Sequence, residues 1–267
     1  MVAFPFFAST KPPATYDQAD LFPCAIKEAH NFRGFLSDFS IAVMDMVLWF
    51  QTRSGILGHI MEIGVLNGKS AAVLSTHAAS NERLILVDIN DWIERDKLAA
   101  IKPDTEFIIC PSDQLRSTSG HRDLKGKCRF IHIDASHEFE PTQCELAIAD
   151  ELMMDNGIVV LDDFANLDHS QTIAAIYKYL FTTKTQLTPF LVTNDKGYLC
   201  RKRHFEFYGS FVLASAIGSM ALRGVTASLA RTDSHPEYRA FYLRERGPYD
   251  TNGLYCTEVY QQFYIKA

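Results

Sequence analysis

Short apolar runs alternate with longer amphipathic segments over most of the chain, and each run has the length of a buried strand. The predicted strands are His59–Ile63, Leu84–Val87, Phe107–Cys110, Phe130–Ile133 and Ile158–Leu161. The predicted helices are 36–53, Lys69–Ala79, Asp91–Ala100, a segment that begins at Pro141 and ends near Gly157, and one from Asp168 or Ser170 to about Phe181. This alternation predicts an α/β fold with a doubly wound, mostly parallel sheet.

The alternation stops beyond the last of these helices. Pro189–Thr193 and Tyr198–Arg201 flank a short turn that contains a glycine, and this pattern predicts a C-terminal hairpin that adds an antiparallel edge to the sheet. Aromatic residues are then frequent up to the C-terminus, as in lids and in oligomer interfaces. We expect three parts: an N-terminal arm and helix (1–34), an α/β domain (35–204), and an aromatic-rich extension that forms a lid or an oligomer interface (205–267).

Composition and charge narrow the classes of function. Hydrophobic residues make up 47% of the 267 residues and charged residues 22%, which is ordinary for a soluble globular protein. The net charge of −6 argues against a nucleic-acid partner, because such proteins usually carry a basic face. Six scattered cysteines without a Cys-x-x-Cys pair indicate a reducing, cytoplasmic setting.

Neither long apolar stretch fits a targeting signal or a membrane span. Residues 2–8 have no basic residue before them and are interrupted by Pro5, so they make a poor signal peptide. Residues 209–230 contain glycines, serines and Arg223, whereas a membrane span is longer and more uniformly apolar. We therefore expect no membrane association.

Acidic residues end two of the predicted strands. Asp134 ends the fourth, with His137 three residues later, and Asp162 and Asp163 end the fifth. The carboxyl ends of parallel strands share one rim, where three carboxylates would repel one another unless a cation or a proton intervenes. A divalent ion bound by carboxylate oxygens resolves this repulsion, and His137 is then placed to move a proton. The alternatives are that the acids are helix caps or turn formers and that His137 is a surface histidine.

A glycine-containing turn follows the first predicted strand. Its candidate residues are Glu62, Gly64, Gly68 and Ser70. Glycines permit a tight turn and the close approach of a ligand, and the following helix start offers free N–H donors. The turn lacks the Gly-x-Gly of a dinucleotide fingerprint and is one residue too short for a P-loop, although Gly-Lys-Ser and the acidic fifth strand resemble an NTPase. A turn that binds nothing is a further alternative.

Two polar residues follow the second and third predicted strands. Asp88 is well placed to accept hydrogen bonds from ribose hydroxyls, and Ser112 is a weaker candidate for contact with an adenine edge. Asp88 has the alternative of a solvated strand-end acid or helix cap, and Pro-Ser-Asp is also a common turn composition. His132, inside the fourth strand, is interpreted as a core histidine.

Four motifs thus occur in order at successive strand ends: Glu62-x-Gly64-x-x-x-Gly68-x-Ser70, Asp88, Asp134-x-x-His137 and Asp162-Asp163. Together they resemble class I S-adenosylmethionine-dependent methyltransferases, whose sheet is Rossmann-like. They are most similar to the metal-dependent O-methyltransferases that act on sugars of natural products and glycans. The resemblance covers roughly residues 35–204, and the ordered set is much more specific than the glycine turn alone.

The resemblance implies a role for each residue. The methionine part of the cofactor would be lined by Glu62, Gly64, Gly68 and Ser70. Asp88 would hold the ribose, and Ser112 would lie near the adenine. Mg²⁺ would be coordinated by Asp134, Asp162 and Asp163, with Asp134 also near the cofactor's amino group. His137 would be the general base. Related catechol-type enzymes have a lysine as the base and an asparagine as the last acid, so this sequence favours the sugar type.

We therefore expect a Mg²⁺-dependent O-methyltransferase that takes its methyl group from S-adenosylmethionine. The expected acceptor is a hydroxyl of a small molecule, in a sugar or glycosylated metabolite, and the expected assembly is a homo-oligomer. A bound divalent ion lowers the pKa of a hydroxyl, and a histidine can then accept its proton near neutral pH. Two alternatives stay open: a P-loop-like NTPase, and a cofactor-binding family member with other chemistry, such as hydroxylation.

Overall fold

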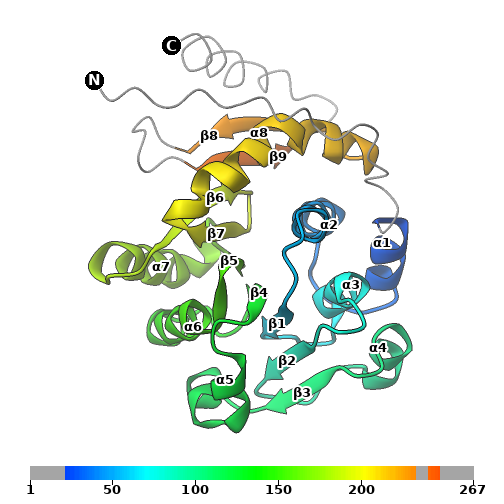
Figure 1. The fold of residues 1–267 in the computed structure, drawn as a ribbon, viewed down its shortest axis with the longest axis vertical. Helices are drawn as coiled ribbons and strands as arrows, with labels where there is room; N and C mark the ends of the chain where they lie inside the picture. Colours follow the sequence, from blue (N-terminus) through cyan, green and yellow to red (C-terminus); the bar gives the residue numbers. More distant parts are fainter. Residues whose placement is uncertain (1–21, 233–239, 247–267) are drawn as a thin grey trace.

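One nine-stranded sheet runs through the part of the chain that the computed structural model describes, residues 22–232 and 240–246 (Figure 1). The strand order is β3-β2-β1-β4-β5-β7-β6-β9-β8. The strands are β1 (His59–Ile63), β2 (Leu84–Asp88), β3 (Glu106–Ile109), β4 (Cys128–Ile133), β5 (Met153–Leu161), β6 (Leu187–Val192), β7 (Gly197–Arg201), β8 (Ala227–Arg231) and β9 (Phe241–Glu245). The predicted α/β architecture, mostly parallel with antiparallel C-terminal strands, is confirmed.

Helices cover both faces of this sheet. They are α1 (Phe22–His30), α2 (Asp38–Arg53), α3 (Lys69–His77), α4 (Arg95–Ile101), α5 (Ser119–Leu124), α6 (Phe139–Leu152), α7 (Ser170–Thr182) and α8 (Phe205–Leu222). Figure 1 shows α1 to α4 on one side of the parallel strands and α5 to α7 on the other. Two separate apolar cores result, one beneath α2, α3 and α8 and one beneath α6 and α7.

The direction in which successive parallel strands are added to the sheet reverses between β1 and β4. From β1 the chain moves outward to β2 and β3, then returns to the other side of β1 as β4 and continues to β5. In open α/β sheets this switch point leaves a crevice beyond the carboxyl ends of the strands, where ligands bind. The loops that follow β1, β2, β3, β4 and β5 therefore all lie at the same edge of the sheet, around this crevice.

Two predicted helix boundaries were wrong. The helix expected to begin at Asp91 begins at Arg95, after a loop. The helix expected to end near Gly157 ends at Leu152, because Met153 already pairs with Cys128 and begins β5. Gly157 lies inside that strand, where an added Cβ would come within 2.8 Å of the carbonyl oxygen of Cys128. This glycine therefore permits a close strand contact and does not mark a helix end.

The predicted hairpin forms, but it is not the edge of the sheet. β6 and β7 pair antiparallel, and β7 joins the parallel strands at β5. β9 then adds to β6 in parallel and pairs with β8, which is the outermost strand. Burial of Phe241 and Leu243 on β9 is the reason that the C-terminal strands join the sheet. The expected arm at residues 1–20 and two parts of the C-terminal extension, 233–239 and 247–267, lie outside the described residues.

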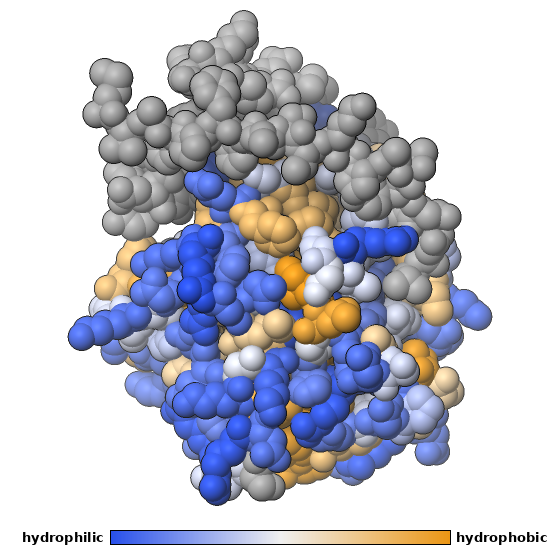
Figure 2. Space-filling model, in the orientation of Figure 1, coloured by the Kyte–Doolittle hydropathy of each residue, from blue (hydrophilic) through white to orange (hydrophobic). Residues whose placement is uncertain are grey.

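One described helix has the length and composition of a membrane span. The segment Lys202–Leu222 has a mean hydropathy of 1.3. Its part α8 packs against α2, β6 and β8, and Tyr208 and Val212 are fully buried there. The apolar character of α8 is accounted for in part by this core packing. Figure 2 shows a viewed face on which hydrophilic residues predominate, with smaller hydrophobic areas between them.

Candidate functional site

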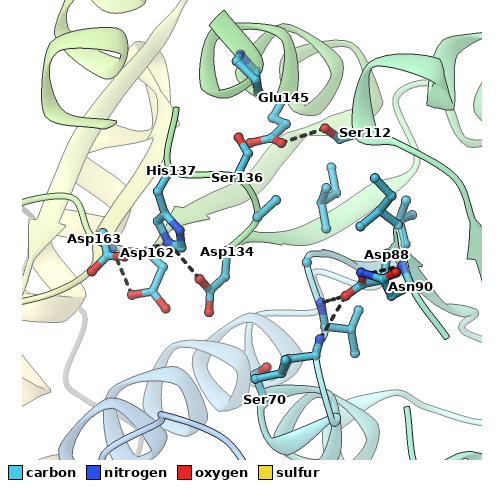
Figure 3. Close-up of a pocket in the computed structure, with 18 of the residues that line it drawn as sticks. Ser70, Asp88, Asn90, Ser112, Asp134, Ser136, His137, Glu145, Asp162 and Asp163 are labelled. Carbon is cyan, nitrogen blue, oxygen red and sulfur yellow. Dashed lines mark hydrogen bonds and ion pairs between the residues drawn. The ribbon is translucent and has the colours of Figure 1, made fainter. Parts of the chain in front are cut away.

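A cavity of about 1010 Å³ opens at the carboxyl ends of the parallel strands. Residues from the loops after β1, β2, β3, β4 and β5 line it, as expected for the switch point of the sheet. Figure 3 shows three groups of polar side chains around it: Asp88 with Asn90, Ser112 with Glu145, and His137 with the three predicted acids. Apolar side chains at its mouth include Phe35, Leu66, Ile89 and Trp92, all exposed.

Gly64 brings β1 and β4 together at the base of the cavity. Its φ is +85°, and an added Cβ would lie 1.9 Å from the carbonyl oxygen of Asp134. Only glycine avoids this clash, because no other residue lacks a Cβ. The first turn of the cavity wall is thus in direct backbone contact with the loop that carries Asp134.

Asp88 holds the glycine turn in place. Its Oδ2 accepts hydrogen bonds from the backbone N–H groups of Val65 and Leu66, at 2.8 and 2.9 Å. Its Oδ1 accepts one from Asn90 N–H at 2.9 Å. The carboxylate lies in the cavity wall where a ribose was predicted, and its oxygens retain lone pairs for further donors. Asp88 therefore shapes the turn, in addition to the ribose contact predicted for it.

We expect Asp88→Ala to weaken the binding of S-adenosylhomocysteine at least tenfold, with or without a divalent ion. The substitution removes the acceptor predicted for ribose hydroxyls and also frees two N–H groups of the turn, each worth about 1 kcal/mol or more in hydrogen bonding. Calorimetric titration measures the change, with Asp91→Ala as the control, because Asp91 pairs with Arg95 on the exposed surface. An unchanged affinity would remove Asp88 from the cofactor site.

Ser112 and Glu145 form a second polar group of the cavity wall. Ser112 Oγ donates to Oε1 of Glu145 at 2.7 Å. Burial raises the pKa of Glu145, and the hydrogen bond from Ser112 only partly opposes this rise. Glu145, on α6, was not predicted as a site residue, because a single glutamate in an amphipathic helix looks like a solvated charge. The structure places both side chains at the cavity beside Cys110 and Pro111.

The three predicted acids meet at the other end of the cavity, but their carboxylates face two ways. Asp134 and Asp162 lie together, and the buried ammonium of Lys196 contacts Asp162. Asp163, whose φ is +52°, faces His137 and His169. Asp134 and Asp162 therefore converge as expected, whereas Asp163 turns toward the imidazole rings of His137 and His169.

The pKa values of the neighbouring Asp134 and Asp162 are shifted in opposite directions. Burial by itself would raise the pKa of Asp134, but the hydrogen bond with His137 and the charge of Lys196 outweigh it, so this pKa is lowered. Burial raises the pKa of Asp162, and the neighbouring Asp134 carboxylate adds to the rise against the opposing effect of Lys196. Lys196 belongs to the turn before β7, and no motif of the sequence indicated that its side chain reaches the acids.

His137 lies between two carboxylates in a left-handed backbone conformation. Its Nε2 is 2.7 Å from Oδ2 of Asp163 and 3.3 Å from Oδ1 of Asp134, and its φ is +56°. The hydrogen bond with Asp134 raises the pKa of His137, although burial opposes this. The His169 ring stacks on the His137 ring with centroids 4.3 Å apart. A histidine in this setting can accept a proton and hold it as an imidazolium ion.

Two predicted site residues lie away from the cavity wall. Glu62 is fully buried, and its Oε1 lies 2.7 Å from Nδ1 of His132. Gly68, with φ +99°, is the N-cap residue before α3 and lies against Phe32. Ser70, by contrast, lines the cavity together with Gly64. The turn therefore contributes two of its four predicted residues directly to the wall.

Comparison with known proteins gives one family match and several structural neighbours. Residues 61–164 match the model of a family described as a methyltransferase domain, while a search of curated proteins finds no match. The cofactor-bound protein Rv0187 from MTB has 15% sequence identity and a TM-score of 0.50, over 72% of this chain and 92% of its own. The MycE methyltransferase from the mycinamycin biosynthetic pathway, in complex with Mg, SAH and mycinamycin VI, has 14% identity and a TM-score of 0.50, over 70% of this chain and 55% of its own. At such identities the likeness concerns the fold.

Proposed function

We propose that the protein transfers the methyl group of S-adenosylmethionine to a hydroxyl of a small molecule, since residues 61–164 match the model of a methyltransferase domain. The observation that carries this proposal is the position of His137, between Asp134 and Asp163 and across the cavity from Asp88 (Figure 3). A cofactor on the Asp88 side and an acceptor on the His137 side would meet in the middle of one cavity.

The chain's own residues divide the work of this reaction. The glycine turn and Asp88 would bind and orient the cofactor, which when bound would supply an activated methyl group and keep the electron pair of its carbon–sulfur bond as a neutral thioether, so no acid is needed. His137 would accept the proton of the acceptor hydroxyl as its oxygen takes the methyl group. Asp134 and Asp163 stabilise the imidazolium ion that results.

The donors at the acidic end fit a divalent cation by charge and by type. Asp134 and Asp162 present oxygens close together, Lys196 contacts Asp162, and Asp163 faces His137 beside them. We propose that Asp134, Asp162 and Asp163 hold Mg²⁺ or another divalent ion. When bound, such an ion lowers the pKa of the acceptor hydroxyl and orients it toward the methyl group.

We further propose that the acceptor is a sugar or a glycosylated metabolite. The histidine and the Asp-Asp pair support this class over catechols, and MycE, which shares the fold, is described in complex with mycinamycin VI. Exposed apolar side chains at the mouth, among them Phe35 and Trp92, offer flat surfaces on which sugar rings stack. A cytoplasmic location and a homo-oligomeric state stay predictions from the sequence.

Calorimetric titration with S-adenosylhomocysteine and with ATP, each with Mg²⁺ and with EDTA, tests the cofactor. We expect a micromolar dissociation constant for S-adenosylhomocysteine in both conditions and no heat from ATP. A screen of glycosylated acceptors by mass spectrometry then tests methyl transfer, again with and without the metal ion. ATP binding alone would overturn the proposal and assign the glycine turn to phosphate.

The NTPase alternative is not favoured. Lys69, which a P-loop would direct at a phosphate, has its Nζ 3.5 Å from the carbonyl oxygen of Gly34 and packs its side chain against that residue. A cofactor-binding protein with other chemistry predicts binding of S-adenosylhomocysteine without any methylated product, and the same screen separates it from the main proposal.

A further inference from the structure

His132 lies beneath the acids, on the strand that carries Asp134. Its side chain is fully buried, and its Nδ1 is 2.7 Å from Oε1 of Glu62, the residue paired with it on β1. Among the described residues, its Nε2 has no hydrogen-bond partner. Leaving a buried polar atom unsatisfied costs about 1–3 kcal/mol, so this nitrogen is a position where a ligand is favoured.

The unpartnered side of His132 belongs to a group of possible metal ligands. A ring nitrogen of His132 and one oxygen each from Asp134 and Asp162 lie within 4.8 Å of one another. His132 and Asp134 are two residues apart on the chain, so both point to the same face of the sheet. Asp162 follows β5, the strand next to β4. Because Nδ1 is engaged by Glu62, Nε2 is the nitrogen that remains for a ligand.

The contact with Glu62 sets the form of the imidazole ring. If Nδ1–H donates to the Glu62 carboxylate, the lone pair of the neutral ring resides on Nε2. Histidines that bind metal ions usually have this arrangement, in which a carboxylate fixes the tautomer and the direction of the ring. Glu62, which does not line the cavity, would then fix the orientation of the His132 ring.

The charges around this group favour a cation. Glu62, Asp134 and Asp162 are three carboxylates, whereas the ammonium of Lys196 contacts Asp162 and the imidazole of His137 contacts Asp134. Even with both of these groups charged, an excess of negative charge stays in a buried place, where it is poorly screened by solvent.

Another buried histidine of the same chain shows what a purely structural pair looks like. His77 is 2.8 Å from Oδ1 of Asp45, and the other oxygen of that carboxylate accepts from Arg223 at 2.6 Å. In the part of the chain that the structure describes, its Nδ1 also has no hydrogen-bond partner. Within the described residues, however, His77 belongs to no group of possible metal ligands. The juxtaposition with two further carboxylates therefore distinguishes His132 from His77.

We propose that His132 Nε2 is a ligand of the divalent ion in this site, together with Asp134 and Asp162, and that Glu62 is its positioning residue. The inference deepens the metal assignment of the proposed function and rests on it only for the ion's part in methyl transfer. A nitrogen ligand shifts the preference of the site from Mg²⁺ toward Zn²⁺ and other transition-metal ions, because these ions accept imidazole more readily and Mg²⁺ prefers oxygen.

Pulsed EPR of the full chain loaded with Mn²⁺ tests the ligand directly, since it detects ¹⁴N bound to the metal. We expect nitrogen coupling in the unmodified protein and its loss in His132→Asn, whose amide can still donate to Glu62. His77→Gln is the matched control and should retain the coupling. Calorimetry should show Mn²⁺ binding at least tenfold tighter than Mg²⁺, and a loss of Mn²⁺ affinity of about 10–100-fold in Glu62→Gln.

The outcomes separate this inference from the proposed function. Bound Mn²⁺ without nitrogen coupling in the unmodified protein, coupling that persists in a folded His132→Asn variant, or no Mn²⁺ binding would each overturn it. Should His132→Asn fail to fold, the unmodified protein and Glu62→Gln still decide the question. Nitrogen-coupled Mn²⁺ without any S-adenosylhomocysteine binding would support the metal site and overturn the methyltransferase proposal. Binding of S-adenosylhomocysteine without nitrogen-coupled Mn²⁺ would support the cofactor part of the proposed function and overturn this inference.

Discussion

Replacing His137 is expected to lower turnover by about 10²–10⁴-fold while the affinity for S-adenosylhomocysteine stays nearly unchanged. Its Nε2 lies among the carboxylates, across the cavity from Asp88, which would hold the ribose of the cofactor. Under the proposed function, the substitution removes the proton acceptor from the reaction and leaves the contacts at Asp88 intact. Single-turnover kinetics with a methylated product as the readout, together with calorimetry, separate the two quantities.

The choice of variant follows from the backbone at this position. With φ at +56°, alanine would add conformational strain to the loss of the ring, whereas asparagine adopts the left-handed region more readily. His137→Asn is therefore the cleaner substitution, with His137→Ala beside it. His30→Ala serves as the control, because His30 is an exposed residue of α1 that pairs with Asp38. Unchanged turnover in both His137 variants would refute its role as the base.

Gly64→Ala is expected to reduce the free energy of unfolding by more than about 3 kcal/mol. The new Cβ would lie 1.9 Å from the carbonyl oxygen of Asp134 and 2.7 Å from Cα of Ala135, both backbone atoms that cannot move without parting β1 from β4. Strain from the positive φ adds to this steric cost. Cofactor affinity should fall as well, since the turn and the loop after β4 both line the cavity.

Gly55→Ala distinguishes the clash from the strain. Gly55 has a φ of +72°, close to that of Gly64, but nothing lies within 4 Å of its added Cβ. We expect it to cost only about 1 kcal/mol, the usual penalty for a left-handed alanine. Urea denaturation followed by circular dichroism measures both variants. Equal losses of stability in the two variants would show that the clash with Asp134 adds nothing to the cost of the left-handed alanine.

The parallel half of the fold was predictable because its strands are short apolar runs bounded by polar turns. β1 was placed to the residue and β2 to within one residue, since burial on both faces leaves an uninterrupted apolar signal. The strands β8 and β9 gave no comparable signal, because only one face of β9 is buried and the run is short. The helix end predicted near Gly157 was wrong, because the sequence does not distinguish a glycine required by close strand packing from one that ends a helix.

The candidate site was predictable as far as strand ends determine position. Topology alone places Asp88, Ser112, Asp134 and Asp162 around one cavity. The sequence could not indicate which way a carboxylate turns, and Asp163 faces the imidazoles. It also could not indicate long-range contacts made by single side chains, such as Lys196 with Asp162 or Glu62 with His132. These depend on packing between strands that no local pattern encodes.

The backbone contact of Gly64 with Asp134 also bears on how the two ends of the cavity are spaced. It joins the glycine turn to the loop after β4 through main-chain atoms. The distance between the Asp88 side and the acidic side is then a property of the sheet. Under the proposed function, loops at the mouth of the cavity could lengthen, shorten or change sequence, and so suit other acceptors, while that distance stays constant.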